Sequence, residues 1–130
     1  MVKVILDLNF LLVPLQFRVD IFEELNNLLG RAEPVILSTT IEELRRILKR
    51  SSGVRYLQFS TALRLAEKCE IIRVERRRGE SYDDVIFRVA KDTGMPVATN
   101  DSELRKRLRK AGLATIYLRQ KSKLEVDGYV

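Results

Sequence analysis

The stretch Val4–Asp7 reads Val-Ile-Leu-Asp, and the stretch Val97–Asp101 reads Val-Ala-Thr-Asn-Asp. Each is a short apolar run that leads into an acidic residue, and such runs predict buried strands of a parallel sheet. The carboxyl ends of parallel strands meet at one edge of a sheet, and open α/β sheets bind ligands there, where the strand order reverses. We therefore expect Asp7 and Asp101 to lie together at that edge.

Strand patterns alternate with helix patterns along the rest of the chain, which is typical of a parallel sheet with helices on both faces. The expected fold class is three-layer α/β/α with a central parallel sheet of about five strands. Residues 1–130 are expected to form one domain, with residues 121–130 as a polar C-terminal tail. The predicted strands are Val2–Leu6, Val35–Leu37, Glu70–Glu75, Pro96–Thr99 and Thr115–Leu118.

Helices are expected between these strands, each with a start or end signal. A capping-box pattern at Asp20 opens a helix that ends at Gly30. Either Thr39 or Thr40 is expected to cap the next helix, paired with the glutamate three residues later. The remaining helices are predicted at Val54–Lys68, at residues 81–94 with Ser81 as the cap, and at Ser102–Ala111.

The composition narrows the chemistry that is open to the protein. The chain has 130 residues, a formal net charge of +6, one cysteine (Cys69) and no histidine. Histidine-based catalysis and imidazole-bound zinc are therefore excluded, and hydrolysis must use carboxylates, lysine or metal-bound water. The positive charge favours an anionic partner such as nucleic acid. No apolar stretch approaches the ~20 residues of a membrane span, and no signal peptide is recognisable, so a cytoplasmic protein without a membrane partner is expected.

Two further acids, Glu43 and Asp83, lie near the starts of predicted helices on the same edge of the sheet. Helix capping does not decide between Glu43 and Glu42. Asp84 is the better capping partner for Ser81, which leaves Asp83 free. Carboxylates ~5 Å apart repel by about 3 kcal/mol per pair at an effective dielectric near 20. A hard divalent cation such as Mg²⁺ or Mn²⁺ would remove that repulsion.

The order and surroundings of these acids resemble the PIN-domain nucleases over residues 2–120. That family has an Asp-Thr-Asn motif after the first strand and a Glu-Leu pair on a helix. It also has an Asp-x-x-Ile-x-x-x-Ala helix and a Thr-x-Asp motif after the fourth strand. By position, the resemblance favours Glu43 over Glu42 and Asp83 over Asp84. The matching stretches here are Asp7-Leu8-Asn9, Glu43-Leu44, Asp83–Ala90 and Thr99-Asn100-Asp101.

The resemblance implies a metal-dependent endoribonuclease, a hydrolase that uses one or two Mg²⁺ or Mn²⁺ ions. Asp7 and Asp101 are the strongest implied metal ligands, and Glu43 and Asp83 complete or orient the site. The catalytic and metal-binding set is thus Asp7, Glu43, Asp83 and Asp101, and the supporting set is Asn9, Thr99, Asn100 and Asp84.

The sequence from Ala98 to Arg119 is most like the archaeal branch of the family that is related to processing of small-subunit ribosomal RNA. The implied partner is therefore RNA, with a ribosomal RNA precursor as the first candidate. Toxin nucleases of toxin–antitoxin pairs share the same acids, so a toxin role is an alternative. The resemblance also favours a homodimer.

Basic residues follow two of the acids along predicted helices. After Asp101, Arg105 and Arg109 share one helix face, and such a face can follow the phosphates of RNA. The alternative is a solvated face without a ligand. The residues expected to bind nucleic acid are Arg45, Arg46, Lys49, Arg76, Arg77, Arg105, Lys106 and Arg109.

Leu8 stands where the family usually has threonine or serine, so a hydroxyl near Asp7 is missing. This departure favours an alternative function, a catalytically weak or inactive RNA-binding or assembly module. Such a module would bind RNA in a salt-sensitive way and without divalent metal. A phosphoryl receiver is disfavoured, because it needs an acceptor Asp after the third strand, where the chain has Glu75-Arg76-Arg77.

Overall fold

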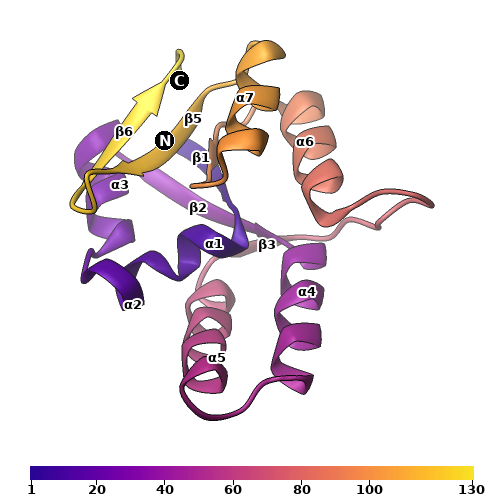
Figure 1. Ribbon diagram of the computed structural model, residues 1–130. Coiled ribbons are helices and arrows are strands. Elements are labelled where there is room, and N and C mark those ends of the chain that lie inside the picture. Colours follow the sequence, from indigo (N-terminus) through magenta and orange to yellow (C-terminus); the bar gives the residue numbers. More distant parts are fainter.

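The structure is a computed structural model that describes residues 1–130, with helices arranged around one six-stranded sheet (Figure 1). The strands are β1 (Val2–Leu6), β2 (Ala32–Leu37), β3 (Glu70–Ile72), β4 (Val97–Ala98), β5 (Thr115–Arg119) and β6 (Lys123–Asp127). Their order is β3-β2-β1-β4-β5-β6, and all neighbours are parallel except β5 and β6. The strand order thus reverses between β1 and β4, the two strands that lead into Asp7 and Asp101.

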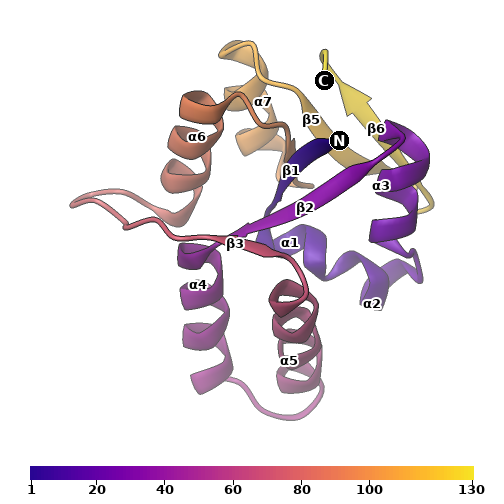
Figure 2. The ribbon, with the colours of Figure 1, turned by 180° about the vertical axis from the view of Figure 1, so that it is seen from behind.

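The helices cover both faces of this sheet (Figures 1 and 2). They are α1 (Leu8–Leu11), α2 (Val13–Phe17), α3 (Ile21–Leu29), α4 (Ser38–Lys49), α5 (Gly53–Glu67), α6 (Tyr82–Thr93) and α7 (Ser102–Lys110). In Figure 1, α4 and α5 lie side by side and project beyond the edge of the sheet. None of these helices is both long enough and apolar enough to cross a membrane.

Successive residues of β1 point to opposite faces of the sheet, as the pleat requires. Val4 and Leu6 belong to a core of 18 buried residues that also includes side chains of α1, α3 and α5. Ile5 belongs to a second core of 10 buried residues that includes side chains of α6 and α7. A sheet that is buried on both faces by helices is a three-layer α/β/α arrangement, so the predicted fold class is confirmed.

Two of the predicted helix caps are present. The Asp20 side chain accepts hydrogen bonds from the backbone N–H groups of Phe22 and Glu23, at 3.2 and 3.1 Å. Ser81 and Asp84 form a reciprocal capping box at the start of α6. Because these caps satisfy N–H groups that the helix itself leaves unpaired, they define where each helix begins.

The predicted cap of α4 is wrong. The helix begins at Ser38 directly after β2, and neither Thr39 nor Thr40 caps it, because Leu37 occupies the N-cap position. The Ser38 hydroxyl is bonded instead to the backbone N–H and C=O of Val74, both at 2.9 Å. This contact ties the start of α4 to the segment that leads from β3 toward α6.

Two strand boundaries differ from the prediction by three residues, and the boundaries of the other predicted strands differ by at most one. β2 begins at Ala32 rather than at Val35, because Pro34 pairs only with β1 and the pairing with β3 starts after it. The missing N–H of proline is therefore never needed. β3 ends at Ile72 rather than at Glu75, and the chain continues as the loop that carries Arg76.

The predicted polar tail is a strand. Residues 123–127 form β6, which pairs antiparallel with β5 along its whole length. Leu124 is buried in the first core, while the rest of the strand is polar or exposed. The composition of this segment therefore gave no indication of a strand. The helices α1 and α2 were not predicted, because they have 4 and 5 residues and are too short to show a helical period.

Burial of Leu124 predicts that β6 contributes to stability. Leu124→Ala should lower the free energy of unfolding by about 2–5 kcal/mol, since it leaves a cavity in the core. Val126→Ala, on the same strand but 38% exposed, is the matched control and should cost much less. Urea denaturation measures both, and equal small losses would show that β6 adds little.

Candidate active site

Asp7 lies at the point where the strand order reverses, and its side chain is only 5% exposed. One carboxylate oxygen accepts a hydrogen bond from the backbone N–H of Leu8 at 2.8 Å, so Asp7 caps α1. The other accepts from the Thr99 hydroxyl at 2.7 Å and from the Asn9 side-chain amide at 3.1 Å. The carboxylate is therefore held from both β1 and the end of β4.

The same hydrogen-bond network continues through the segment after β4. The Asn9 amide oxygen accepts from the backbone N–H of Asn100 at 3.0 Å, and the Thr99 hydroxyl accepts from the backbone N–H of Asp101 at 3.1 Å. The Asn100 amide oxygen accepts from the backbone N–H of Leu118 in β5 at 2.8 Å. The structure thus brings together Asn9, Thr99 and Asn100, which sequence reasoning assigned a supporting part.

The other three acids come from three different helices. Asp101 is the N-cap of α7, and its Oδ1 accepts from the backbone N–H groups of Glu103 and Leu104 at 2.9 and 3.1 Å. Asp83 lies in the first turn of α6, and Glu43 lies on α4. Asp83 and Glu43 are partly buried and neither carboxylate accepts a hydrogen bond from the protein. Their oxygens are therefore free to take a ligand.

Burial and the charges of neighbouring acids raise the pKa values of Asp7, Glu43 and Asp83. Burial, followed by the negative charges of Asp83 and Asp101, raises the pKa of Asp7 to about 6, against the hydrogen bonds from Thr99 and Leu8 that lower it. Burial and the charges of Asp7 and Asp83 raise the pKa of Glu43 to about 7. Burial and the charge of Asp101 raise the pKa of Asp83. The four groups therefore share one negative field.

Glu42 and Asp84, the neighbours of Glu43 and Asp83 in sequence, have different surroundings from the four site acids. Glu42 is exposed, one position away from Glu43 on α4. Asp84 belongs to the capping box with Ser81 and forms an ion pair with Arg107 at 2.6 Å. The backbone N–H of Ser81 and the Arg107 guanidinium lower the pKa of Asp84. Asp84 is thus neutralised within the protein and braces the start of α6.

The donor set fits a hard divalent cation in its chemistry, because every available side-chain ligand is a carboxylate. No three acidic or cysteine side chains lie close enough together to hold a metal ion directly. Mg²⁺ typically keeps several of its own waters and uses only one or two carboxylates. The four acids therefore suit ligation that is partly through water, in which Glu43, Asp83 and Asp101 would offer the oxygens that the protein leaves open.

A family described as PIN like domain matches residues 4–121. The chain belongs to the PIN-like domain family. Ribonuclease VapC4 of Methanocaldococcus jannaschii is 31% identical over 132 residues, which cover 100% of both chains. The rRNA-processing protein fcf1 of Schizosaccharomyces pombe is 34% identical over 110 residues, which cover 82% of this chain and 53% of that protein. The predicted family is confirmed, and its members here include a ribonuclease.

Solved structures agree with this assignment. The structure of the PIN domain endonuclease Utp24 superposes with a TM-score of 0.79 at 30% identity, covering 98% of this chain and 92% of that one. A domain of a functionally unknown protein from Methanocaldococcus jannaschii superposes with a TM-score of 0.69 at 17% identity, covering 100% and 99%. The second match supports the fold alone.

In this PIN-like domain the basic residues expected to bind nucleic acid fall into separate places. Arg46 donates a hydrogen bond to the Tyr82 hydroxyl at 3.0 Å, and Arg76 lies over the Tyr82 ring at 4.5 Å. Lys106 and Arg109 line a surface hollow of about 710 Å³ on α7. The others are spread more widely: Arg45 borders another hollow, Lys49 and Arg77 are exposed, and Arg105 lies over the Tyr117 ring at 4.0 Å.

The predicted site and binding residues did not include Tyr82, Arg50 or Arg107. Tyr82 borders a hollow of about 220 Å³ together with Glu43, Arg46 and Arg50. Arg107 lies over the Phe87 ring at 4.2 Å and its charge lowers the pKa of Asp83. The position of Tyr82 immediately before Asp83 could have identified it from the sequence. The contact of Arg107 with α6 could not be identified in this way, since it depends on how two helices pack.

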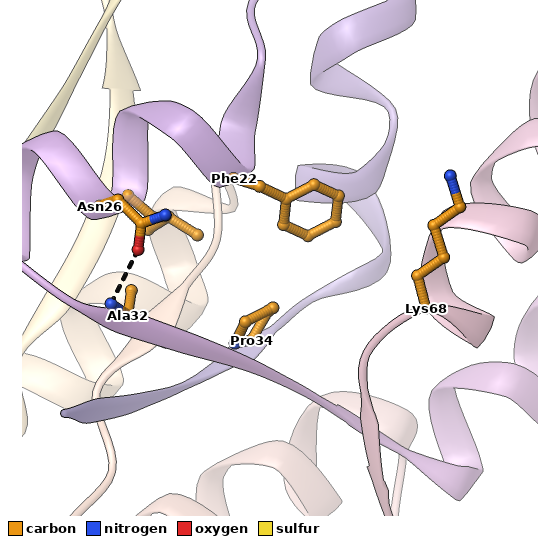
Figure 3. Close-up of a pocket in the computed structure, with 6 residues that line it drawn as sticks. Phe22, Asn26, Ala32, Pro34 and Lys68 are labelled. Atoms are coloured by element: carbon orange, nitrogen blue, oxygen red, sulfur yellow. Dashed lines mark hydrogen bonds between the residues drawn. The ribbon is translucent and has the colours of Figure 1, made fainter.

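Another hollow, of about 190 Å³, lies away from the four acids (Figure 3). It is bordered by α3, β2 and the end of α5, and Figure 3 shows Phe22 and Pro34 beside it. The Asn26 side chain accepts a hydrogen bond from the backbone N–H of Ala32 at its rim, at 2.9 Å. Its lining contains no acidic residue, so it has no part in the carboxylate site.

The raised pKa values of Asp7 and Glu43 make stability depend on pH. Both acids bind a proton more readily in the folded than in the unfolded protein. Their contribution to stability is therefore present at low pH and is lost as the pH rises through about 6 and about 7. The chain has no histidine that would titrate in this interval. Without divalent metal, the free energy of unfolding should fall between roughly pH 4 and pH 7, by up to about 3 kcal/mol from Asp7.

Urea denaturation at several pH values measures this slope. Asp7→Asn and Glu43→Gln should each flatten it, and Mn²⁺ should flatten it in the unmodified protein, since a cation compensates the ionised carboxylates. A protein whose stability increases over this interval in the absence of metal would contradict the coupling of the acids.

The Thr99 hydroxyl is expected to stabilise the site. Thr99→Val removes the donor to Asp7 and the acceptor for Asp101, which should lower the free energy of unfolding by about 1–3 kcal/mol. Thr115→Val is the matched control, because Thr115 is fully buried in β5 and its hydroxyl has no partner. That control should be neutral or stabilising, and equal losses in both variants would argue against a special part for Thr99.

Proposed function

We propose that this PIN-like domain is an Mg²⁺- or Mn²⁺-dependent endoribonuclease that cuts RNA phosphodiesters at Asp7, Glu43, Asp83 and Asp101. The observation that carries the proposal is the convergence of these acids, from four separate segments, at the reversal of strand order. A structural set of carboxylates would be paired with cations, as Asp84 is with Arg107. These acids form no ion pair, and the charges of neighbouring acids help to raise the pKa values of Asp7, Glu43 and Asp83.

The four acids differ in how many of their carboxylate oxygens are hydrogen-bonded within the protein, and their proposed roles follow from this difference. Asp7 is anchored on both oxygens and therefore sets the position of the site. Asp101 is anchored through one oxygen only, and Glu43 and Asp83 through none, so these three present open oxygens. A bound Mg²⁺ or Mn²⁺ would neutralise the charge of the scissile phosphate and make a water nucleophilic near neutral pH.

Basic side chains next to the acids support RNA as the substrate. The arrangement of Arg46 and Arg76 around Tyr82 lies beside Glu43 and Asp83. Farther along α7 from its cap residue Asp101, Lys106 and Arg109 line a basic hollow. Arginine and lysine contacts to phosphates give position and affinity without reading sequence. The proposed binding set remains Arg45, Arg46, Lys49, Arg76, Arg77, Arg105, Lys106 and Arg109.

A role in ribosomal RNA processing is part of the proposal. It rests on the similarity to a relative whose name states that it is an rRNA-processing protein, and on the local sequence around Asp101. The relative whose name states that it is a ribonuclease supports RNA cleavage in general. Cleavage of a ribosomal RNA precursor in preference to unrelated RNA of equal length would support the narrower role.

The alternative function, an inactive RNA-binding module, was inferred from Leu8, which lacks the hydroxyl of the usual threonine or serine. The Leu8 side chain is 9% exposed and packs in the first core, so it does not point into the site. Thr99 supplies a hydroxyl to Asp7 from the neighbouring strand. Leu8 is therefore a weaker argument for an inactive carboxylate site.

Cleavage of ribosomal RNA fragments with purified protein tests the proposal. Glu43→Gln and Asp101→Asn should each reduce metal-dependent cleavage by about 100-fold or more while the fold remains, since asparagine also caps helices well. Glu42→Gln, one residue away and exposed, is the matched control and should cleave normally. A chelator should abolish cleavage. Cleavage that survives Glu43→Gln and Asp101→Asn, or RNA binding without any cleavage by the unmodified protein, would refute the assignment.

A further inference from the structure

A hollow of about 490 Å³ adjoins the carboxylate site on the side of α1 and α2. It lies between these helices and the turn that joins β5 to β6, which Figure 1 shows on the left of the molecule, whereas α6 is on the right. Pockets that enclose small ligands typically measure about 300–1,000 Å³, so this hollow has the size of a binding site for one nucleoside.

The inner wall of the hollow belongs to the network that holds Asp7. Asn9 and Asn100 line it, and both are hydrogen-bonded within that network. The Asn100 amide oxygen is used by the backbone N–H of Leu118, which leaves its NH₂ group free to donate. A group bound in the hollow would therefore lie next to the acids that are proposed to cut the phosphodiester.

The remaining walls combine apolar surface with carboxamides. Leu12, Phe17 and Leu118 form the apolar part. Gln16 and Gln120 are exposed at opposite sides, on α2 and in the turn. A carboxamide offers one donor and one acceptor side by side, which is the pattern that pairs with the edge of a nucleobase, and apolar side chains pack on its face.

The turn between β5 and β6 has an unusual sequence for its conformation. Gln120 and Lys121 both have positive φ, at 54° and 64°, and the backbone N–H of Ser122 donates to the C=O of Arg119 at 3.3 Å. A turn with two such central residues is of the type I′ class, in which asparagine and glycine are the usual residues. Side chains that are kept where the backbone disfavours them point to a function for those side chains.

We propose that this hollow is a subsite that receives an unpaired nucleobase of the RNA next to the scissile phosphate. In this subsite Gln120 and Gln16 bind the edge of the base, Phe17 packs against it, and Lys121 contacts the adjacent phosphate. The subsite gives the nuclease a preference for one base at a fixed position from the cut. This inference deepens the proposed function and rests on it for the position of the cut.

Replacing Gln120 and Lys121 by asparagine and glycine tests whether these side chains only form the turn or also bind RNA. Asparagine and glycine suit the type I′ conformation, so the double variant Gln120→Asn/Lys121→Gly should fold and melt at a higher temperature. If the two side chains only form a turn, RNA binding should be unchanged. If they form the subsite, binding should weaken about tenfold, the loss expected for one base contact.

The test uses the full chain and single-stranded RNA octamers that differ at one position, with binding measured by fluorescence anisotropy in EDTA. The unmodified protein should prefer one base at that position, and both the double variant and Gln16→Ala should lose the preference. Lys91→Gln, which removes one positive charge from the end of α6, is the control and should keep it. Cleavage of the same octamers with Mn²⁺ then places the preferred base relative to the cut.

The outcomes distinguish the two proposals. Base preference that is lost in both variants supports the subsite. This holds even if no octamer is cut, a result that would count against the nuclease assignment and not against the subsite. Cleavage without base preference, or a preference that survives both variants, overturns the subsite and leaves the nuclease assignment intact. Binding that weakens equally in Lys91→Gln would show a general effect of charge and would also overturn it.

Discussion

The buried carboxylate of Asp7 is the group on which the rest of this structure depends. It follows β1 at the edge of the sheet, where the strand order reverses between β1 and β4, and it is held there by Leu8, Asn9 and Thr99. Burial of a charge without a cationic partner is costly, and the hydrogen bonds recover only a part of that cost. This cost to stability is what we expect of an acid that serves the proposed chemistry.

The other acids are arranged so that their free oxygens remain available. Helix starts position three of the four: Asp7 and Asp101 are N-caps, and Asp83 lies in the first turn of α6. Backbone N–H groups at a helix start stabilise negative charge without a counter-ion. The fold can therefore concentrate carboxylates at one place, while exposed cations such as Arg76 are proposed to bind the phosphates of RNA.

Aromatic and charged side chains support the surroundings of the site. Tyr82 is held by Arg46 and Arg76, and Arg88 binds Glu80 in a two-pronged ion pair at 2.9 Å. Arg88 also donates to the backbone C=O of Glu75 at 2.8 Å. The loop that carries Arg76 is thus tied to α6, the helix that carries Asp83. Asp83 and Arg76, a proposed phosphate-binding residue, are in this way positioned by the same short segment.

Sequence alone determined the alternation of strands and helices, the α/β class and the candidate acids Asp7 and Asp101. These features follow from local signals: apolar runs, capping residues and acids placed directly after strands. The choice of Glu43 over Glu42 needed the resemblance to a family, because both fit the same helix. Ser81 and Asp84 were found as a pair, because a capping box is a contact between residues three apart.

Tertiary structure decided what depends on contacts between distant residues. The start of α4 is set by the bond between Ser38 and Val74, which overrides the threonine caps. β6 exists because Leu124 reaches the core and its backbone pairs with β5, neither of which its polar composition shows. The hydrogen bond from Thr99 to Asp7 spans 92 positions of the chain, and only the packing of β1 beside β4 creates it.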